Sequence, residues 1–206
     1  MRDTIQTERL TLRPLLLSDA PTYSAFGNDY DIAKMTGSFP HPFPLMSAEF
    51  KIMQLRSLVR RKQAYVYVLS QDNGAFMGDV SLFKNPPKRN PSEPNPTDRK
   101  EDASFSIGYW LGRPFWGNGY ISEAARALLN EARATFKSDL RVNASIYTDN
   151  PESVSVINKL GFEPCVGEAT GFSMARLANA PLLHFRLNTA VSAPLKDTFE
   201  TTEAII

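Results

Sequence analysis

The feature that most constrains the fold is a strand pattern that runs through a glycine loop into a long amphipathic helix. In ASFSIGYWL, residues 103–111, apolar side chains take every second position, which is typical of a strand with two unlike faces. After the loop GRPFWGNGY, apolar residues recur at helical spacing from Ile121 to Phe136. Gly117 and Gly119 let the loop turn sharply and approach a ligand closely. The pattern predicts a strand–loop–helix unit in an α/β protein.

The loop has the properties of a phosphate-binding turn. The main-chain N–H groups of about Asn118 to Ser122 have no partner inside the first helical turn, and they lie at the positive end of the helix dipole. The lysine–serine pair of a P-loop is absent, and Ser122 stands where a G-x-G-x-x-G motif has its third glycine. The same glycines would also suit a plain strand-to-helix turn, so the loop alone leaves both interpretations open.

Composition excludes several other classes of site. The chain has 206 residues, 42% of them hydrophobic, which is enough for one domain with its own core. A net charge of +1 gives no general attraction to nucleic acid or to an anionic membrane. One cysteine and two histidines allow no internal disulfide and no zinc cluster, so no metal is expected. The charged start MRDTIQTERL and the lack of an apolar run of ~18 residues favour a cytoplasmic protein without a membrane segment.

The remaining elements predict a mixed sheet with helices on both faces. Alternating or β-branched stretches predict strands at residues 9–15, 64–69, 75–83, 140–147, 162–166 and 182–187. Helices are expected from a cap at Ser18 or Asp19 through Phe26, at residues 29–36, after a cap at Ser47, and from an Asn150 cap to Gly161. Strand–helix–strand units favour parallel pairing in the second half, whereas the middle strands form antiparallel hairpins.

These elements form a single domain, residues 1–190. Residues 85–102 hold five prolines and eight charged side chains without apolar periodicity, so we expect a proline-rich loop insertion there. Residues 191–206 are expected to be a polar C-terminal tail. The stretch GSFPHPFP, residues 37–44, has too many prolines for regular structure.

Three segments carry a resemblance to a known family. Residues 107–129, IGYWLGRPFWGNGYISEAARALL, resemble the acyl-CoA-binding motif of the GNAT N-acetyltransferases. Residues 149–162, DNPESVSVINKLGF, resemble the family's second CoA-side segment, and residues 7–15, TERLTLRPL, resemble its first strand. The branch resembled is the RimJ/RimL type. The resemblance implies an α/β (α+β) fold, GNAT-like, with a largely antiparallel sheet and a central splayed parallel pair.

The resemblance also implies acetyl-CoA as the cofactor and assigns its contacts. Backbone groups exposed where the strand splays would bond the pantetheine arm, at Tyr109, Trp110 and Leu111. Backbone amides of the glycine loop would hold the pyrophosphate, at Trp116, Gly117, Asn118, Gly119, Tyr120 and Ile121. Asn150 would contact the cofactor, and Ser153 would face its thiol end or its phosphates. Both residues would also be ordinary at the start of a helix, Asn150 as its N-cap and Ser153 at its third position.

The catalytic positions depart from the family pattern. Where many members have a tyrosine acid this chain has Ile157, and where they have a strand glutamate as base it has Ser106. Ser153 is therefore the candidate that assists the leaving thiolate, and Ser106 occupies the slot of the base. Other candidate bases, each weighed against plain solvent exposure, are Asp79, Asp102, Glu168 and His41. His184 and Cys165 are expected to be structural.

The missing carboxylate bears on the acceptor. An α-amine, with a pKa of ~7.7–8.0, is roughly a tenth neutral at pH 7, whereas a lysine amine, with a pKa of ~10.4, is far less so. A protein or peptide N-terminus is therefore the expected acceptor, and Phe39, His41 and Phe43 are its expected contacts unless they only pack the helices. The alternatives are a small-molecule amine acetyltransferase and a non-catalytic CoA-binding regulator. No nucleic acid or membrane partner is expected, and the protein is a monomer or homodimer.

Overall fold

The computed structural model describes residues 1–72, 74–86, 104–136 and 140–189. A nine-stranded sheet runs in the order β1–β2–β3–β4–β5–β6–β9–β7, and β8 pairs with the first part of β9. The strands are β1 (Ile5–Gln6), β2 (Thr11–Pro14), β3 (Ala64–Ser70), β4 (Gly78–Lys84), β5 (Ser104–Leu111), β6 (Leu140–Tyr147), β7 (Glu163–Pro164), β8 (Ala169–Ser173) and β9 (Ala178–Thr189).

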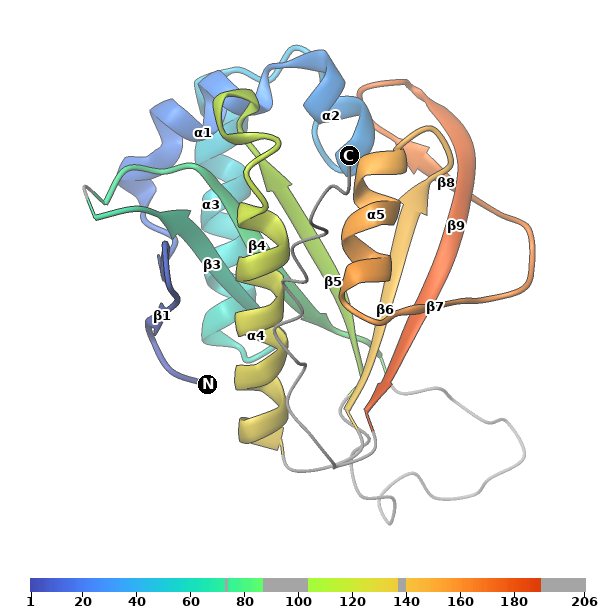
Figure 1. Ribbon diagram of the computed structural model, residues 1–206. Helices are drawn as coiled ribbons and strands as arrows, with labels where there is room; N and C mark the ends of the chain where they lie inside the picture. The colour runs from blue at the N-terminus through green and yellow to red at the C-terminus, as the bar shows by residue number, and fades with distance from the viewer. Residues whose placement is uncertain (73, 87–103, 137–139, 190–206) are drawn as a thin grey trace, which may run out of the picture.

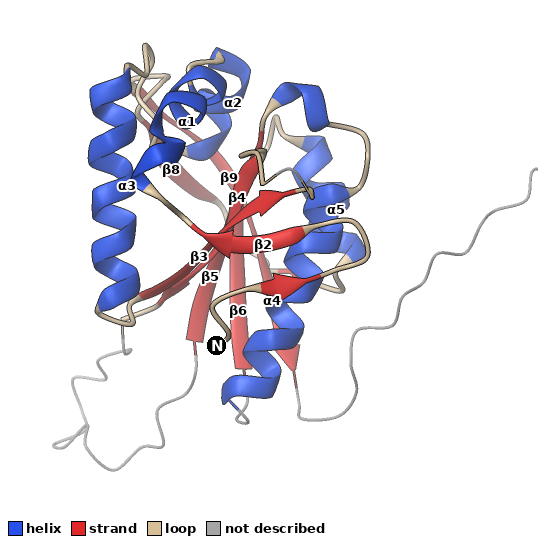
Figure 2. Cartoon of the chain, turned by 90° about the vertical axis from the view of Figure 1, so that its left-hand side faces the viewer, coloured by secondary structure: helices blue, strands red, loops and turns tan. Residues whose placement is uncertain are grey.

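Helices cover both faces of this sheet (Figures 1 and 2). One face carries α1 (Ala20–Gly27), α2 (Tyr30–Thr36) and α3 (Leu45–Arg60), and the other carries α4 (Tyr120–Phe136) and α5 (Pro151–Lys159). Two short 3-10 helices, η1 (Leu17–Asp19) and η3 (Arg113–Phe115), precede α1 and the glycine loop. Within the described residues, no helix is both long and apolar enough to cross a membrane.

Within the part of the chain that the structure describes, every strand pairing is antiparallel except that of β5 with β6, and this pair is short. Its ladder begins at Ser104–Arg141 and ends at Ser106–Asn143. Beyond that point β5 stays paired with β4 as far as Leu111, and β6 stays paired with β9 as far as Tyr147. The two strands therefore diverge, as Figure 1 shows. The expected mixed, largely antiparallel sheet with a splayed central parallel pair is confirmed.

The alternation of β5 divides its side chains between two cores. Phe105, Ile107 and Leu111 join the core under α4 and α5, whereas Trp110 joins the core under α1 to α3. The inward face of α4 is fully buried against the first core, at Ala124, Ala125, Leu128, Leu129 and Ala132. The helical spacing and the strand alternation of this segment therefore predicted the right faces.

The later elements agree with the sequence, and two strands were missed. The Asn150 side chain accepts a hydrogen bond from the Ser153 main-chain N–H, and Pro151 takes the first position of α5, as expected. The strands β1 and β8 were not predicted. Each is short and pairs on one side only, so its sequence needs no clear alternation. Residues 87–102 of the expected insertion, and the tail at 191–206, lie outside the described residues.

Two helix starts need correction. Helix α3 begins at Leu45 after Pro44, and Ser47 lies inside its first turn instead of capping it. Pro44 takes the N-cap position with an extended backbone, and its side chain has no acceptor, so this helix starts without a side-chain cap. Asp19 does not cap α1 with its side chain, because its carboxylate binds the Arg13 guanidinium at 2.7 Å and the Leu16 main-chain N–H at 2.9 Å.

The close approach of β4 to the end of β5 depends on Gly78. A Cβ added there would lie 2.2 Å from the Trp110 carbonyl oxygen. We expect Gly78→Ala to lower the free energy of unfolding by about 2–3 kcal/mol, the upper range for overpacking. Gly74→Ala is the control, because its added Cβ meets nothing within 4 Å and only the φ of +71° is strained, at a cost of about 1–2 kcal/mol. Urea unfolding midpoints measure both changes, and equal losses would contradict the role of Gly78.

Candidate active site

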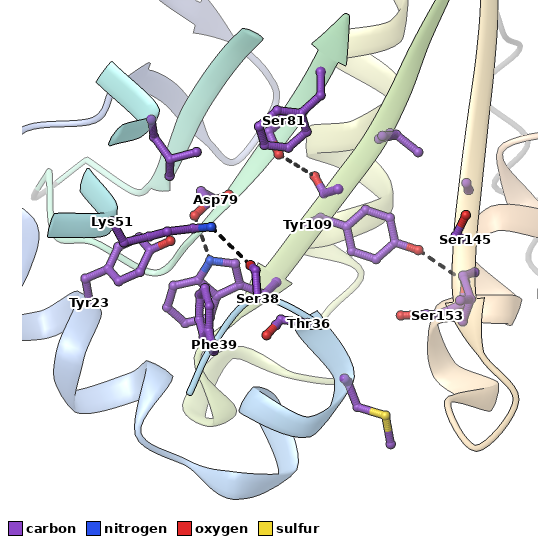
Figure 3. A pocket seen from close by; sticks show the side chains of 18 residues that line it. Tyr23, Thr36, Ser38, Phe39, Lys51, Asp79, Ser81, Tyr109, Ser145 and Ser153 are labelled. Carbon is purple, nitrogen blue, oxygen red and sulfur yellow. Dashed lines mark hydrogen bonds between the residues drawn. The ribbon is translucent and has the colours of Figure 1, made fainter. Parts of the chain in front are cut away.

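The gap between β5 and β6 opens into a pocket of about 270 Å³ (Figure 3). Residues of β5 and β6 line its two sides, and residues of β4, α2, α3 and α5 complete it. The lining residues are Tyr23, Met35, Thr36, Ser38, Phe39, Lys51, Leu55, Asp79, Ser81, Phe83, Ile107, Gly108, Tyr109, Trp110, Ala144, Ser145, Ile146 and Ser153. The pocket therefore forms where the parallel ladder ends.

A buried carboxylate, Asp79 on β4, lies in the pocket wall. Its residue is only 5% exposed, and its Oδ2 accepts a hydrogen bond from Trp110 Nε1 at 2.6 Å. The Tyr23 hydroxyl also hydrogen-bonds to it. Burial raises the pKa of Asp79 to about 6, although these two hydrogen bonds and the charge of Lys51 oppose the rise. Of the four candidate bases from the sequence, Asp79 is the one among the described residues that lines the pocket.

The raised pKa has a consequence for stability. The folded-state pKa of Asp79, about 6, lies above the usual 3.8, so the folded protein holds this proton more tightly than the unfolded chain does. Asp79 therefore destabilises the fold increasingly as the pH rises from about 4 to about 6, and the full effect is present at neutral pH. A charged group that is buried at a cost in stability is typical of functional sites.

The other side of the opening presents a serine–histidine pair. Ser145 on β6 lines the pocket, and its Oγ lies 2.8 Å from Nδ1 of His184, its cross-strand partner on β9. The sequence suggested only a structural place for His184. It missed this pair because the register of β6 with β9, which sets the two side chains opposite each other, is a long-range property.

Tyr109 bridges the opening from β5 to α5. Its hydroxyl donates to the Ser153 main-chain carbonyl at 3.2 Å, and burial raises its pKa to about 12. A thiol has a pKa of ~8.5, so full proton transfer from this phenol to a thiolate is unfavourable by roughly 3.5 units. Tyr109 can therefore serve a developing thiolate only as a hydrogen-bond donor, and Ser153, which lines the same pocket, offers a second hydroxyl.

The glycine loop forms an anion cradle before α4. Gly117 and Gly119 have φ values of 77° and 75°, the left-handed region that glycine favours. The main-chain N–H groups of residues 117–122 make no hydrogen bond within the described chain, whereas the Glu123 N–H already donates to the Gly119 carbonyl. A Cβ at Gly117 would meet nothing within 4 Å, so the concave side of the loop is open. The loop fits the pyrophosphate of CoA.

Two backbone groups that were expected to contact the cofactor, the Trp116 N–H and the Leu111 carbonyl, already form hydrogen bonds inside the protein. The Trp116 N–H donates to the Arg113 carbonyl at 3.2 Å, and the Trp116 indole donates to the Leu111 carbonyl at 2.7 Å. These bonds form because η3 folds the chain back between β5 and the loop. The Trp116 amide therefore supports the cradle from outside and should not be counted among the amides that hold phosphate.

Arg9 is a residue of the cradle that the sequence did not single out. Its Nε donates to Glu123 Oε2 at 2.7 Å, its Nη1 donates to the Asn118 carbonyl at 3.0 Å, and its guanidinium lies 4.8 Å from the centre of the Tyr120 ring. Arg9 thus ties the segment before β2 to the loop and places a positive charge beside it. The motif TERL contained this residue, but its long-range contacts could not be read from spacing.

Several expected site residues lie away from the pocket. Ser106 donates its hydroxyl to Asn85 Oδ1 at 2.7 Å, because its side chain lies before the strands part. Phe43 is buried and stacks on Phe39 at 4.7 Å, and the exposed His41 ring contacts Tyr30, so neither borders the pocket. Their assignment as acceptor contacts needs correction, and only Phe39 keeps that place. Glu168 is exposed away from the pocket, and Asp102 lies outside the described residues.

Comparison with known proteins agrees with this geometry. Residues 9–163 match the Acetyltransferase (GNAT) domain family. This match covers more than half of the chain, so the protein belongs to the GNAT acetyltransferases. It is an acetyl-CoA-dependent N-acetyltransferase. Its fold is similar to those of RimJ and RimL structures.

The individual relatives are distant. An uncharacterized N-acetyltransferase p20 from Bacillus licheniformis is 26% identical over 162 residues, which are 78% of this chain and 83% of that protein. Mycobacterium smegmatis RimJ, solved with CoA-disulfide, has a TM-score of 0.73 at 18% identity over 90% of this chain and 87% of its own. RimL, a ribosomal L7/L12 alpha-N-protein acetyltransferase solved with CoA, has a TM-score of 0.72 at 18% identity over 92% and 99%. These structures share the fold.

Gly119→Glu should abolish binding of CoA. A Cβ at this position lies 3.7 Å from Arg9 Nη2, so the new carboxylate would neutralise that cation and add a negative charge beside the cradle. Two unit charges 4 Å apart interact by about 4 kcal/mol at an effective dielectric constant of 20. Gly119→Ala introduces the backbone strain without the charge and is the control, with a much smaller loss expected. Calorimetric titration with CoA measures both dissociation constants. Unchanged affinity in Gly119→Glu would refute the cradle.

Arg9→Met should weaken CoA binding about tenfold, because the loop loses its brace and the cradle loses a nearby charge. Arg2→Met is the matched control. Arg2 pairs with Glu131 on the same helix, but its side chain is 77% exposed and it has no contact with the loop. The same titration measures both variants. A parallel loss in the two variants would show that Arg9 acts only through the general stability of α4.

Proposed function

We propose that this N-acetyltransferase acetylates the N-terminal α-amine of a protein or peptide, with Asp79 as the group that takes up the proton. The observation that carries the proposal is the buried carboxylate in the opening between β5 and β6, where the amine must approach the thioester. The pocket also supplies apolar walls from Phe39 and Trp110, which exclude water from the reacting groups.

Proton transfer to Asp79 costs less from an α-amine than from a lysine. A carboxylate with a pKa of about 6 takes a proton from an ammonium of pKa ~8 against a gap of roughly two units. The same transfer from a lysine, with a pKa of ~10.4, is unfavourable by more than four units. Each unit corresponds to about 1.4 kcal/mol, so the difference between the two acceptors is about 3 kcal/mol.

The chain's own residues divide the remaining work. Acetyl-CoA, when bound, supplies the activated acetyl group as a thioester. The N–H groups of residues 117–122 would bind its phosphates, and the free edge of β5 would orient the pantetheine arm. Tyr109 and Ser153 would offer hydroxyl groups to the leaving thiolate, and the raised Asp79 carboxylate would accept the proton of the attacking amine. Asn150 orients Ser153 through its cap.

The relatives support an α-amine as the acceptor. RimL is named as an alpha-N-protein acetyltransferase, which is consistent with the acceptor proposed here. A second candidate function is acetylation of a small-molecule amine, because a pocket of about 270 Å³ would also hold such a molecule. Mass spectrometry after incubation with acetyl-CoA and a library of short peptides separates the two functions. Acetylation of free amines alone would favour the second.

The pH dependence tests the base. We expect kcat/KM for a peptide to rise with pH through a limb centred near 6, because Asp79 must be ionised to accept the proton. Asp79→Asn should lower kcat by about 10²–10⁴-fold and remove this limb. The variant should also gain more resistance to urea at pH 7.5 than at pH 4.5, because it removes a charge that destabilises the fold only above pH 4.

His184→Gln is the control for this assignment. His184 is hydrogen-bonded to Ser145, which lines the same pocket, so its imidazole is the other side chain that could take up the proton there. Retention of the limb in His184→Gln and its loss in Asp79→Asn is the expected result. The reverse pattern would transfer the role of base to His184.

A further inference from the structure

A lysine side chain enters the pocket from α3 and has little to bind there. The Lys51 ammonium makes one hydrogen bond, to Ser38 Oγ at 3.1 Å, and no carboxylate of the described residues lies within ion-pair distance of it. Burial lowers the pKa of Lys51, and the charge of Asp79 only partly offsets this. An ammonium group has three hydrogen-bond donors, so most of its bonding capacity is unused within the described chain.

Local structure holds the two groups in this place. Gly37, with a φ of 68°, ends α2 and turns the chain so that Ser38 faces α3. Lys51 follows the buried Ala48 and precedes the buried Ile52, so the burial of this face of α3 directs its stem inward. Figure 3 shows the Lys51 amine between Ser38 and the side chains of Asp79 and Tyr23. The fold therefore sets the position of the Lys51 ammonium group.

The depths of these groups differ. Asp79 is buried, Lys51 is half-buried, and Ser38 is exposed. All three residues line the same pocket, so an acceptor whose amine reaches Asp79 lies close to Lys51 and Ser38. A desolvated cation beside the acceptor favours an anionic ligand group, because pairing would restore the interactions that burial removed.

We propose that the acceptor carries a carboxylate close to its amine, and that Lys51 and Ser38 bind this carboxylate while the amine faces Asp79. This inference rests on the proposed function and specifies its substrate class. The carboxylate has two sources, the side chain of an aspartate or glutamate at the first or second position of a peptide, or the α-carboxylate of a free amino acid. Both place an acidic group within a few bonds of the amine.

Matched substrates test the proposal. Peptides that begin with Glu or Gln, or that carry Glu or Gln at the second position, differ only in the charge. Free glutamate and glutamine, compared with their α-amides, report on the second source. We expect kcat/KM for acidic acceptors to exceed that for their amide counterparts at least about tenfold in the wild-type protein. Thiol release from acetyl-CoA and mass spectrometry of the products measure the ratio.

Variants of α3 assign the effect to Lys51. Lys51→Met keeps the length of the stem and removes the charge, so the preference for acidic acceptors should fall to about one. The preference is a ratio of two acceptors measured on the same variant, so a change in the Asp79 pKa, which Lys51 also influences, affects both alike. Lys51→Arg should retain the preference. Arg56→Met removes a positive charge from an exposed position on the same helix and should leave the preference unchanged. Loss of the preference in Arg56→Met as well would show a general effect of charge and overturn the proposal.

A binding measurement distinguishes failure of this inference from failure of the proposed function. Equal kcat/KM for Glu and Gln peptides would overturn the carboxylate subsite but leave α-amine acetylation standing. If no peptide is acetylated, the proposed function fails, and calorimetric titration of the CoA-loaded protein with the same peptides still decides the subsite. Tighter binding of Glu peptides that Lys51→Met abolishes would support it, and equal binding of Glu and Gln peptides would overturn it.

Discussion

The active site depends on the point at which β5 and β6 stop pairing. The two strands share a ladder only as far as Ser106 and Asn143, and beyond it each is held from its outer side, β5 by β4 and β6 by β9. Because these outer ladders continue, the strands part without losing their own order. The resulting gap connects the two faces of the sheet. The pocket formed there is lined from both faces, by Ser153 of α5 on one and by Tyr23 of α1 and Lys51 of α3 on the other.

The opening also explains why charged groups are held in an apolar region. The rise of the Asp79 pKa from 3.8 to about 6 corresponds to roughly 3 kcal/mol against the ionised form in the fold. The hydrogen bonds from Tyr23 and Trp110 limit this cost and fix the carboxylate in one orientation. The fold therefore gives up stability to keep a buried carboxylate in the pocket, a cost that is typical of functional sites.

Local patterns predicted the cofactor side of the protein and failed on the acceptor side. The glycine loop, α4 and the Asn150 cap are encoded by short-range spacing, so their positions followed from the residues alone. Ser106 was a candidate because it occupies the position of the family's strand glutamate. The ladder that ends there keeps its side chain out of the pocket. The pKa of Asp79 arises from segments far apart in the chain, and no local pattern reports such a meeting. The short strands β1 and β8 were missed for the same reason.

Arg113 connects two parts of the candidate active site. Its guanidinium binds the Asp29 carboxylate at 2.6 Å and the Asp31 carboxylate at 2.7 Å, and it lies 4.9 Å from the centre of the Trp116 ring. It thus joins the start of α2 to the turn that supports the cradle. Exposed ion pairs contribute little to stability, so the value of this contact lies in geometry. Because α2 leads into Ser38, the same contact also ties the turn before the glycine loop to one wall of the pocket.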